Sequence, residues 1–267
     1  MGMNRLTQRY LALCLASFFY IIFADGSLAG NDHAAFVEYQ SGPDSVVSYL
    51  VLPQGKGTFP AVILIHEWWG LNDWIMQIAD SFATKGYVAL AVDLYRGRRA
   101  SSPEEAHELM RGVPEDRVIR DLKAAEAYLG SRSEIRGTKI GVIGWCMGGG
   151  YALSAAMNIQ GLAATVVCYG RLATDTTEIQ KIAAPVLGIF GKEDRGISPQ
   201  SVRSFEKTAK GLGKNVEMVI YDYSGHAFMN PNNATGYRRA AAINAWDRIF
   251  RFLDTWLKPG SRGPRKN

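Results

Sequence analysis

Cysteine is scarce in this chain, with three residues in 267. Cys14 lies in an apolar segment near the N-terminus, so only Cys146 and Cys168 fall in the rest of the chain. Two cysteines are too few to hold a small domain together by disulfides. A bond between Cys146 and Cys168 is not expected, because one lies in a glycine-rich turn and the other ends a separate strand-like run. With 47% hydrophobic residues, the chain instead predicts a single domain built around one apolar core.

Other features are missing altogether. Residues 40–257 contain no internal repeat and no low-complexity linker. The net charge of +5 is not gathered into a basic stripe or a nucleic-acid recognition motif. The pair His66-Glu67 begins like the zinc motif H-E-x-x-H, but Gly70 stands where the second histidine would be. We therefore expect no nucleic-acid partner, no metal and no cofactor.

The N-terminus has the pattern of an export signal. Arg5 and Arg9 precede an apolar stretch, and Ser27-Leu28-Ala29 supplies small residues for cleavage. The sequence predicts a signal peptide over 1–29, a folded domain over 30–257 and a basic disordered tail over 258–267. The mature protein, of charge +4, is then periplasmic or secreted, without stable membrane association. An uncleaved membrane anchor is the alternative.

Short apolar runs alternate with longer amphipathic ones. The predicted strands are Val46–Leu52, Ala61–His66, Tyr87–Asp93, Lys139–Gly144, Ala163–Tyr169, Val186–Phe190 and Val216–Tyr221. Helices are predicted between them, one from the cap Asn72 to Gly86, one carrying Val118 to Leu129, and one opened by Ser198-Pro199. A last helix carries a buried stripe, predicted as Ile243, Trp246, Phe250 and Leu253. This alternation predicts an α/β fold, a mostly parallel sheet with helices on both faces.

The segment Gly144-Trp145-Cys146-Met147-Gly148 is the most informative motif. It follows a β-branched run and leads into a small-residue helical segment, as in the G-x-S-x-G nucleophile elbow. Cysteine stands at the nucleophile position, and a helix N-terminus stabilises a thiolate. The alternative for the motif alone is a buried structural cysteine in a tight turn.

A nucleophilic cysteine needs a base. Among four histidines, His33 lies near the predicted cleavage site and His107 lies in a polar run expected to form an exposed helix. His226 follows the last predicted strand, where α/β-hydrolases place their catalytic histidine. The acid is expected after the preceding strand, where Asp194 is the first choice and Glu193 the fallback.

Glu67 ends an apolar strand in Ile65-His66-Glu67-Trp68-Trp69. A carboxyl group placed there is expected to be partly desolvated and to keep its proton more readily. It either takes part in catalysis or supports the elbow structurally. The backbone N–H groups of Met147 and Trp68 are the predicted oxyanion hole.

Taken together, these residues resemble the dienelactone hydrolase family of α/β-hydrolases. The resemblance covers residues 36–257 and includes Asp93-Leu94-Tyr95, Tyr169-Gly170 and Gly225-His226-Ala227-Phe228. It implies a hydrolase whose Cys146 rests as a thiol, whose Glu67 takes the thiol proton when substrate binds, and whose His226–Asp194 pair assists turnover.

The resemblance implies a lactone or small carboxylic ester as substrate. The family's dienelactone-cleaving members hold the substrate carboxylate with arginines, one of them shortly after the catalytic histidine. Here that stretch reads Met229-Asn230-Pro231, and the remaining candidates are Arg96, Arg98, Arg111 and Arg117. A thioesterase or general short-acyl esterase, and a noncatalytic ligand-binding protein, are the alternatives. A monomer or small homo-oligomer is expected.

Overall fold

A computed structural model describes residues 33–258, apart from the side chains of residues 136–138. The predicted signal peptide lies outside the described residues, and so does the predicted tail except for Lys258. No helix within residues 33–258 is long and apolar enough to cross a membrane.

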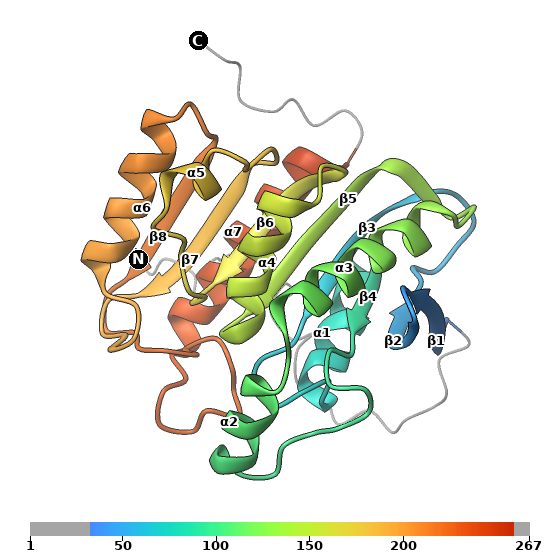
Figure 1. The fold of residues 1–267 in the computed structure, drawn as a ribbon, viewed down its shortest axis with the longest axis horizontal. Helices are drawn as coiled ribbons and strands as arrows, with labels where there is room; N and C mark the ends of the chain where they lie inside the picture. The colour runs from blue at the N-terminus through green and yellow to red at the C-terminus, as the bar shows by residue number, and fades with distance from the viewer. Residues whose placement is uncertain (1–32, 259–267) are drawn as a thin grey trace, which may run out of the picture. The chain divides into compact units, whose positions relative to one another are not determined.

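The centre of the fold is an eight-stranded sheet in the order β1-β2-β4-β3-β5-β6-β7-β8 (Figure 1). The first two strands run antiparallel to their neighbours, and all later pairs are parallel. The strands are β1 (Ala34–Ser41), β2 (Asp44–Val51), β3 (Phe59–Ile65), β4 (Val88–Val92), β5 (Ile135–Trp145), β6 (Leu162–Cys168), β7 (Val186–Gly191) and β8 (Val216–Tyr221). The parallel strands all end at one edge of the sheet, so the loops that follow them meet there.

Helices cover both faces of the sheet (Figure 1). They are α1 (Asp73–Thr84), α2 (Pro103–Arg111), α3 (Glu115–Gly130), α4 (Met147–Asn158), α5 (Thr176–Ile179), α6 (Pro199–Gly211) and α7 (Arg239–Leu257). Helices α1 and α7 pack on one face, whereas α3, α4 and α6 pack on the other. This arrangement confirms the predicted α/β-hydrolase architecture.

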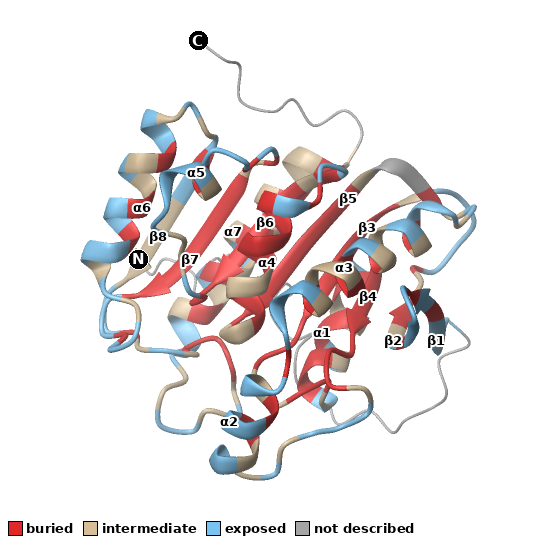
Figure 2. Cartoon of the chain, in the orientation of Figure 1, coloured by how far each residue is buried: buried red, intermediate tan, exposed pale blue. Residues whose placement is uncertain are grey.

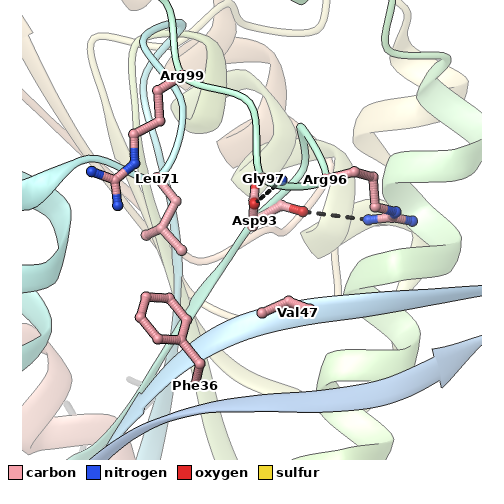
Figure 3. Close-up of a pocket in the computed structure, with 7 residues that line it drawn as sticks. All are labelled: Phe36, Val47, Leu71, Asp93, Arg96, Gly97 and Arg99. Atoms are coloured by element: carbon pink, nitrogen blue, oxygen red, sulfur yellow. Dashed lines mark hydrogen bonds between the residues drawn. The ribbon is translucent and has the colours of Figure 1, made fainter.

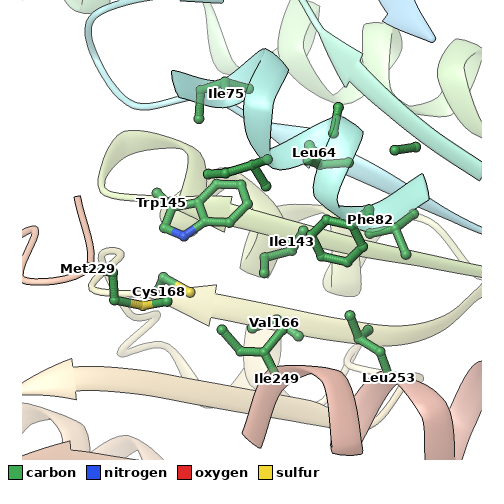
Figure 4. Packing of buried hydrophobic residues seen from close by; sticks show 14 of the residues in the cluster. Leu64, Ile75, Phe82, Ile143, Trp145, Val166, Cys168, Met229, Ile249 and Leu253 are labelled. Carbon is green, nitrogen blue, oxygen red and sulfur yellow. The ribbon is translucent and has the colours of Figure 1, made fainter. Parts of the chain in front are cut away.

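The central strands are buried on both faces, as their continuous apolar runs predict (Figure 2). Every residue of β4 and β7 is buried. On the α1 and α7 face, Trp145 belongs to one apolar cluster with Phe82, Ile249 and Leu253 (Figure 4). The strand that carries the elbow is therefore fixed by packing on either side.

Helix starts follow the predicted caps. The Asn72 side chain accepts a hydrogen bond from the Ile75 N–H at 3.2 Å, and Ser198 accepts one from the Ser201 N–H at the same distance. Each cap satisfies a backbone donor that the first helical turn leaves unpaired.

Two expectations need correction. The edge strand β1 was not predicted, because its residues are mostly exposed or half-buried and lack a continuous apolar run. The buried stripe of α7 is also rotated from its predicted position, with only Leu253 of the predicted four fully buried. Ala242, Ala245, Ile249 and Leu257 complete it. The stripe combines two alanines with larger aliphatic side chains, and the bulky Trp246 and Phe250 are only partly buried against the cluster.

Glycines allow α4 to approach β3 closely. A Cβ atom on Gly148 would overlap the carbonyl oxygen of Ile65 and lie 2.5 Å from that of His66. These are backbone atoms, so the overlap cannot be relieved by turning a side chain. Only glycine fits where the first turn of α4 crosses the end of β3.

Replacing Gly148 by alanine should therefore lower the free energy of unfolding by roughly 1–3 kcal/mol, the usual cost of overpacking. Urea denaturation measures this change. Gly130→Ala is the matched control, because its added Cβ meets no atom within 4 Å at the exposed end of α3. Equal stability of the two variants would contradict the close approach.

Candidate active site

Cys146 sits at the turn between β5 and α4 with a strained backbone. Its φ of 54° and ψ of −115° lie outside the regions that non-glycine residues favour. Its N–H donates to the Cys168 carbonyl oxygen at 3.0 Å, which ties the turn to β6. The residue is half-buried and its thiol is free. This is the strand–turn–helix geometry of a nucleophile elbow.

His226 and Asp194 come together from two loops. The Nδ1 atom of His226 lies 2.7 Å from Oδ2 of Asp194. The other oxygen of Asp194 accepts hydrogen bonds from the N–H groups of Gly196 and Ile197 at 2.8 and 3.1 Å. The fallback Glu193 is exposed, so Asp194 is the acid that orients the histidine.

Both partners carry shifted pKa values. Burial lowers the pKa of His226, but its interactions with Asp194 and with the Cys146 side chain outweigh burial and raise the pKa to about 10. Burial raises the pKa of Asp194, but His226 and two backbone N–H groups outweigh it and lower the pKa overall. The Asp194 carboxylate and the Cys146 sulfur atom thus both favour the protonated imidazole, and the Coulomb contribution of Cys146 is that of a charged thiolate.

Glu67 lies buried at the same edge of the sheet, 3% exposed. Its Oε2 accepts a hydrogen bond from Nδ2 of Asn230 at 2.7 Å. Its Oε1 is buried with no hydrogen-bond partner among the described residues, and the buried hydroxyl of Tyr169 likewise has none. The Glu67 and Tyr169 side chains are nonetheless close enough to act on each other's pKa, so the carboxyl group faces both Asn230 and Tyr169.

Burial raises the pKa of Glu67 from 4.5 to about 7, although Asn230, His226 and Tyr169 each lower it in part. The direction agrees with the expectation from the sequence.

Tyr95 contacts both residues of the predicted oxyanion hole, Trp68 and Met147. Its hydroxyl lies 3.1 Å from the Trp68 carbonyl oxygen and 3.2 Å from the Met147 sulfur atom. Within residues 33–258, the N–H groups of Trp68 and Met147 form no hydrogen bond. Trp68 also packs edge-on against His107 of α2, with ring centroids 4.8 Å apart.

His66 has a structural role. Its Nε2 accepts a hydrogen bond from the Leu94 N–H at 3.2 Å, so Nδ1 carries the proton and donates to the Glu67 carbonyl oxygen at 2.6 Å. Burial lowers its pKa, which keeps the ring neutral. The histidine thereby connects the loops after β3 and β4.

None of the four candidate arginines acts on the pKa of Glu67 or His226. Arg96 forms a two-pronged ion pair with the buried Asp121, at 2.9 and 2.8 Å. Arg117 donates to the Leu94 carbonyl oxygen at 3.0 Å. Arg98 and Arg111 are exposed.

A cavity of about 300 Å³ lies near the same edge of the sheet (Figure 3). Its lining does not include Cys146, His226, Asp194 or Glu67. It is lined by Phe36, Val47, Leu71, Asp93, Arg96, Gly97 and Arg99. Its position beside β1 and β2 separates it from the elbow.

Sequence reasoning did not assign a site role to Tyr95, Tyr169 or Asn230. A signal was present for two of them, because both tyrosines follow apolar strands that end at the active edge. Tyr169 has a positive φ of 39° and packs against the His226 ring at 5.3 Å. Asn230 gave no signal of its own, since only the folded loop brings it to Glu67.

The fold, together with a cysteine at the turn between strand β5 and helix α4, defines an α/β-hydrolase. The dienelactone hydrolase family model matches residues 46–257. The chain is 30% identical over 229 residues to a "Putative carboxymethylenebutenolidase" of Aquifex aeolicus, which covers 83% of this chain and 98% of that protein. It is also 30% identical over 240 residues to a "Probable 2-oxo-3-(5-oxofuran-2-ylidene)propanoate lactonase" of a Bradyrhizobium species, with 85% and 96% covered.

Solved structures agree with this assignment. A "Putative Dienelactone Hydrolase" from Klebsiella pneumoniae superposes with a TM-score of 0.76 at 25% identity, covering 82% of this chain and 97% of that one. The chain belongs to the dienelactone hydrolase family, and it is thus a carboxylic ester hydrolase.

The raised pKa of Glu67 makes stability depend on pH. The folded state binds this proton more tightly than the unfolded state, so the free energy of unfolding falls as pH rises from about 4.5 to about 7. Glu67→Gln removes this effect and should be more stable than the parent protein above pH 7, by up to roughly 3 kcal/mol.

Denaturation of both proteins at a series of pH values measures the difference. Glu38→Gln, which removes an exposed carboxylate from β1, controls for the change in net charge. A Glu67→Gln advantage that stays constant from pH 4 to pH 8 would contradict the assignment.

Proposed function

We propose that the protein hydrolyses a lactone or small carboxylic ester through an acyl intermediate on Cys146. One arrangement carries the proposal, namely a free thiol on a strained elbow beside the His226–Asp194 pair. The backbone fixes the thiol at the edge of the sheet, and the half-exposed histidine is open to substrate.

In the first step, Glu67 takes the proton of Cys146. Oε1 is the oxygen available, because Oε2 is occupied by Asn230. A carboxyl group with a pKa of about 7 can both accept and return a proton near neutral pH. The thiolate then attacks the ester carbonyl, a C–S bond forms, and the carbonyl electron pair moves to oxygen. In this proposal the N–H groups of Met147 and Trp68 stabilise that oxyanion.

In the second step, the oxyanion collapses and the ester C–O bond breaks. The protonated His226 donates its proton to the leaving alkoxide, which in a lactone remains attached to the acyl group. His226 is then neutral and accepts a proton from water, whose oxygen attacks the thioester. Cys146 leaves as a thiolate and recovers its proton from Glu67, which returns the site to its starting state. Asp194 orients the imidazole throughout.

The substrate class rests on the relatives. Two of them are named for hydrolysis of butenolide-type lactones, and the chain spans nearly their whole length. The predicted export signal adds the proposal that the enzyme acts outside the cytoplasm, on a substrate encountered there.

Cys146→Ala should abolish hydrolysis of lactones, p-nitrophenyl esters and acyl thioesters, with kcat/KM falling by roughly a factor of 10³ or more. The thioesters test the alternative function on the same site. Cys168→Ala is the matched control, since that thiol is fully buried and should affect stability more than turnover. Turnover by Cys146→Ala equal to that of the parent protein would contradict the proposed mechanism.

Glu67→Gln should lower kcat by roughly 10²–10⁴-fold, the usual contribution of a positioned acid–base group. The parent enzyme should lose activity as pH falls below about 7, because Glu67 becomes protonated and cannot accept the thiol proton. The residual activity of the variant should lack that decline. The measurement is kcat against pH, and an unchanged acidic limb in Glu67→Gln would exclude this role.

A further inference from the structure

Asn230 is buried in the loop between β8 and α7, 4% exposed, and its side chain donates a hydrogen bond to Glu67. The loop also contains His226, four residues earlier. A single short segment therefore supplies both the histidine and the partner of the glutamate.

The orientation of the Asn230 side chain is fixed by its other contact. Its Oδ1 accepts a hydrogen bond from the Asn232 N–H at 2.9 Å, so Nδ2 is the atom that faces Glu67. The Asn230 N–H donates to the Ala227 carbonyl oxygen at 3.1 Å, which anchors the backbone beneath it. The amide is thus held ready to donate to Glu67.

No lysine or arginine of the described residues is among the groups that shift the pKa of Glu67. Besides burial, its pKa responds to Asn230, His226 and Tyr169. Burial and the charge of Glu67 in turn raise the pKa values of Cys168 and Tyr169. Of all these neighbours only His226 can be cationic, and it already faces Asp194 and Cys146.

We propose that Asn230 is a positioning residue for Glu67, and that its neutral amide adapts the site to uncharged lactones and esters. This inference rests on the proposed function. A substrate carboxylate bound beside Glu67 would meet a second negative charge in a buried setting without a compensating cation. Like charges that share a desolvated site are strongly unfavourable, so such a substrate should bind poorly.

Two butenolides test this inference. One carries an exocyclic methylene group, and the other carries an exocyclic carboxymethylene group on the same ring. The parent enzyme should show a kcat/KM at least roughly tenfold higher for the neutral lactone, the discrimination expected of one buried charge contact. Asn230→Arg should lower or invert this ratio, because a cation then faces the carboxylate.

Asn230→Ala keeps the experiment decisive if the arginine variant does not fold. Without its donor, Glu67 should hold its proton more firmly, so the acidic limb of the kcat–pH profile should move to higher pH. Loss of packing alone would lower activity without moving that limb. Asn215→Arg and Asn215→Ala, at an exposed turn before β8, control for charge and truncation.

Two results would overturn the inference while leaving the proposed function intact. One is a parent enzyme that needs Cys146 but prefers the carboxylate-bearing lactone. The other is a substrate ratio unchanged in Asn230→Arg together with a pH profile unchanged in Asn230→Ala. A parent enzyme that hydrolyses neither lactone nor any ester would instead refute the proposed function itself.

Discussion

The close approach of α4 to the strands beneath it is the constraint on which the site depends. No side chain fits at Gly148, where the helix crosses the end of β3, or at Gly149, where an added Cβ would lie 2.7 Å from the Cys168 carbonyl oxygen. The chain can enter the helix only by a sharp turn, and that turn forces Cys146 to a φ of 54°. The packing of β5 on both faces maintains this strained backbone conformation. The turn places the thiol at the edge of the sheet.

Two carboxyl groups at this edge of the sheet have pKa values that are shifted in opposite directions. Asp194 accepts two backbone N–H groups and faces His226, which together hold its pKa low. Glu67 is buried with a neutral amide as its hydrogen-bond partner, which leaves its pKa near 7. Two acids of similar intrinsic strength thus have pKa values shifted in opposite directions, a separation that arises from environment alone.

Much of this arrangement could be predicted from the sequence, because strand and helix periodicity are local properties. The central strands, the caps Asn72 and Ser198, and the chain order of Cys146, Asp194 and His226 all follow from such patterns. The edge strand β1 and the rotated stripe of α7 did not, since an edge strand needs no apolar run and two positions of the α7 stripe are alanines, which are less conspicuous in the sequence than Trp246 and Phe250. Asn230 could not be found either, because its contact with Glu67 joins residues 163 positions apart.

The separate glutamate has a physical reason in the state of the histidine. Asp194 favours the imidazolium form of His226, and a charged Cys146 raises its pKa further, to about 10. A protonated imidazole cannot accept the thiol proton, although it is well suited to protonate a leaving alkoxide. Asp194 is a weak acceptor as well, since its pKa is lowered and its oxygens are occupied. Glu67 has a pKa of about 7, because the effect of burial outweighs the lowering effects of Asn230, His226 and Tyr169, so its carboxylate can accept a proton near neutral pH.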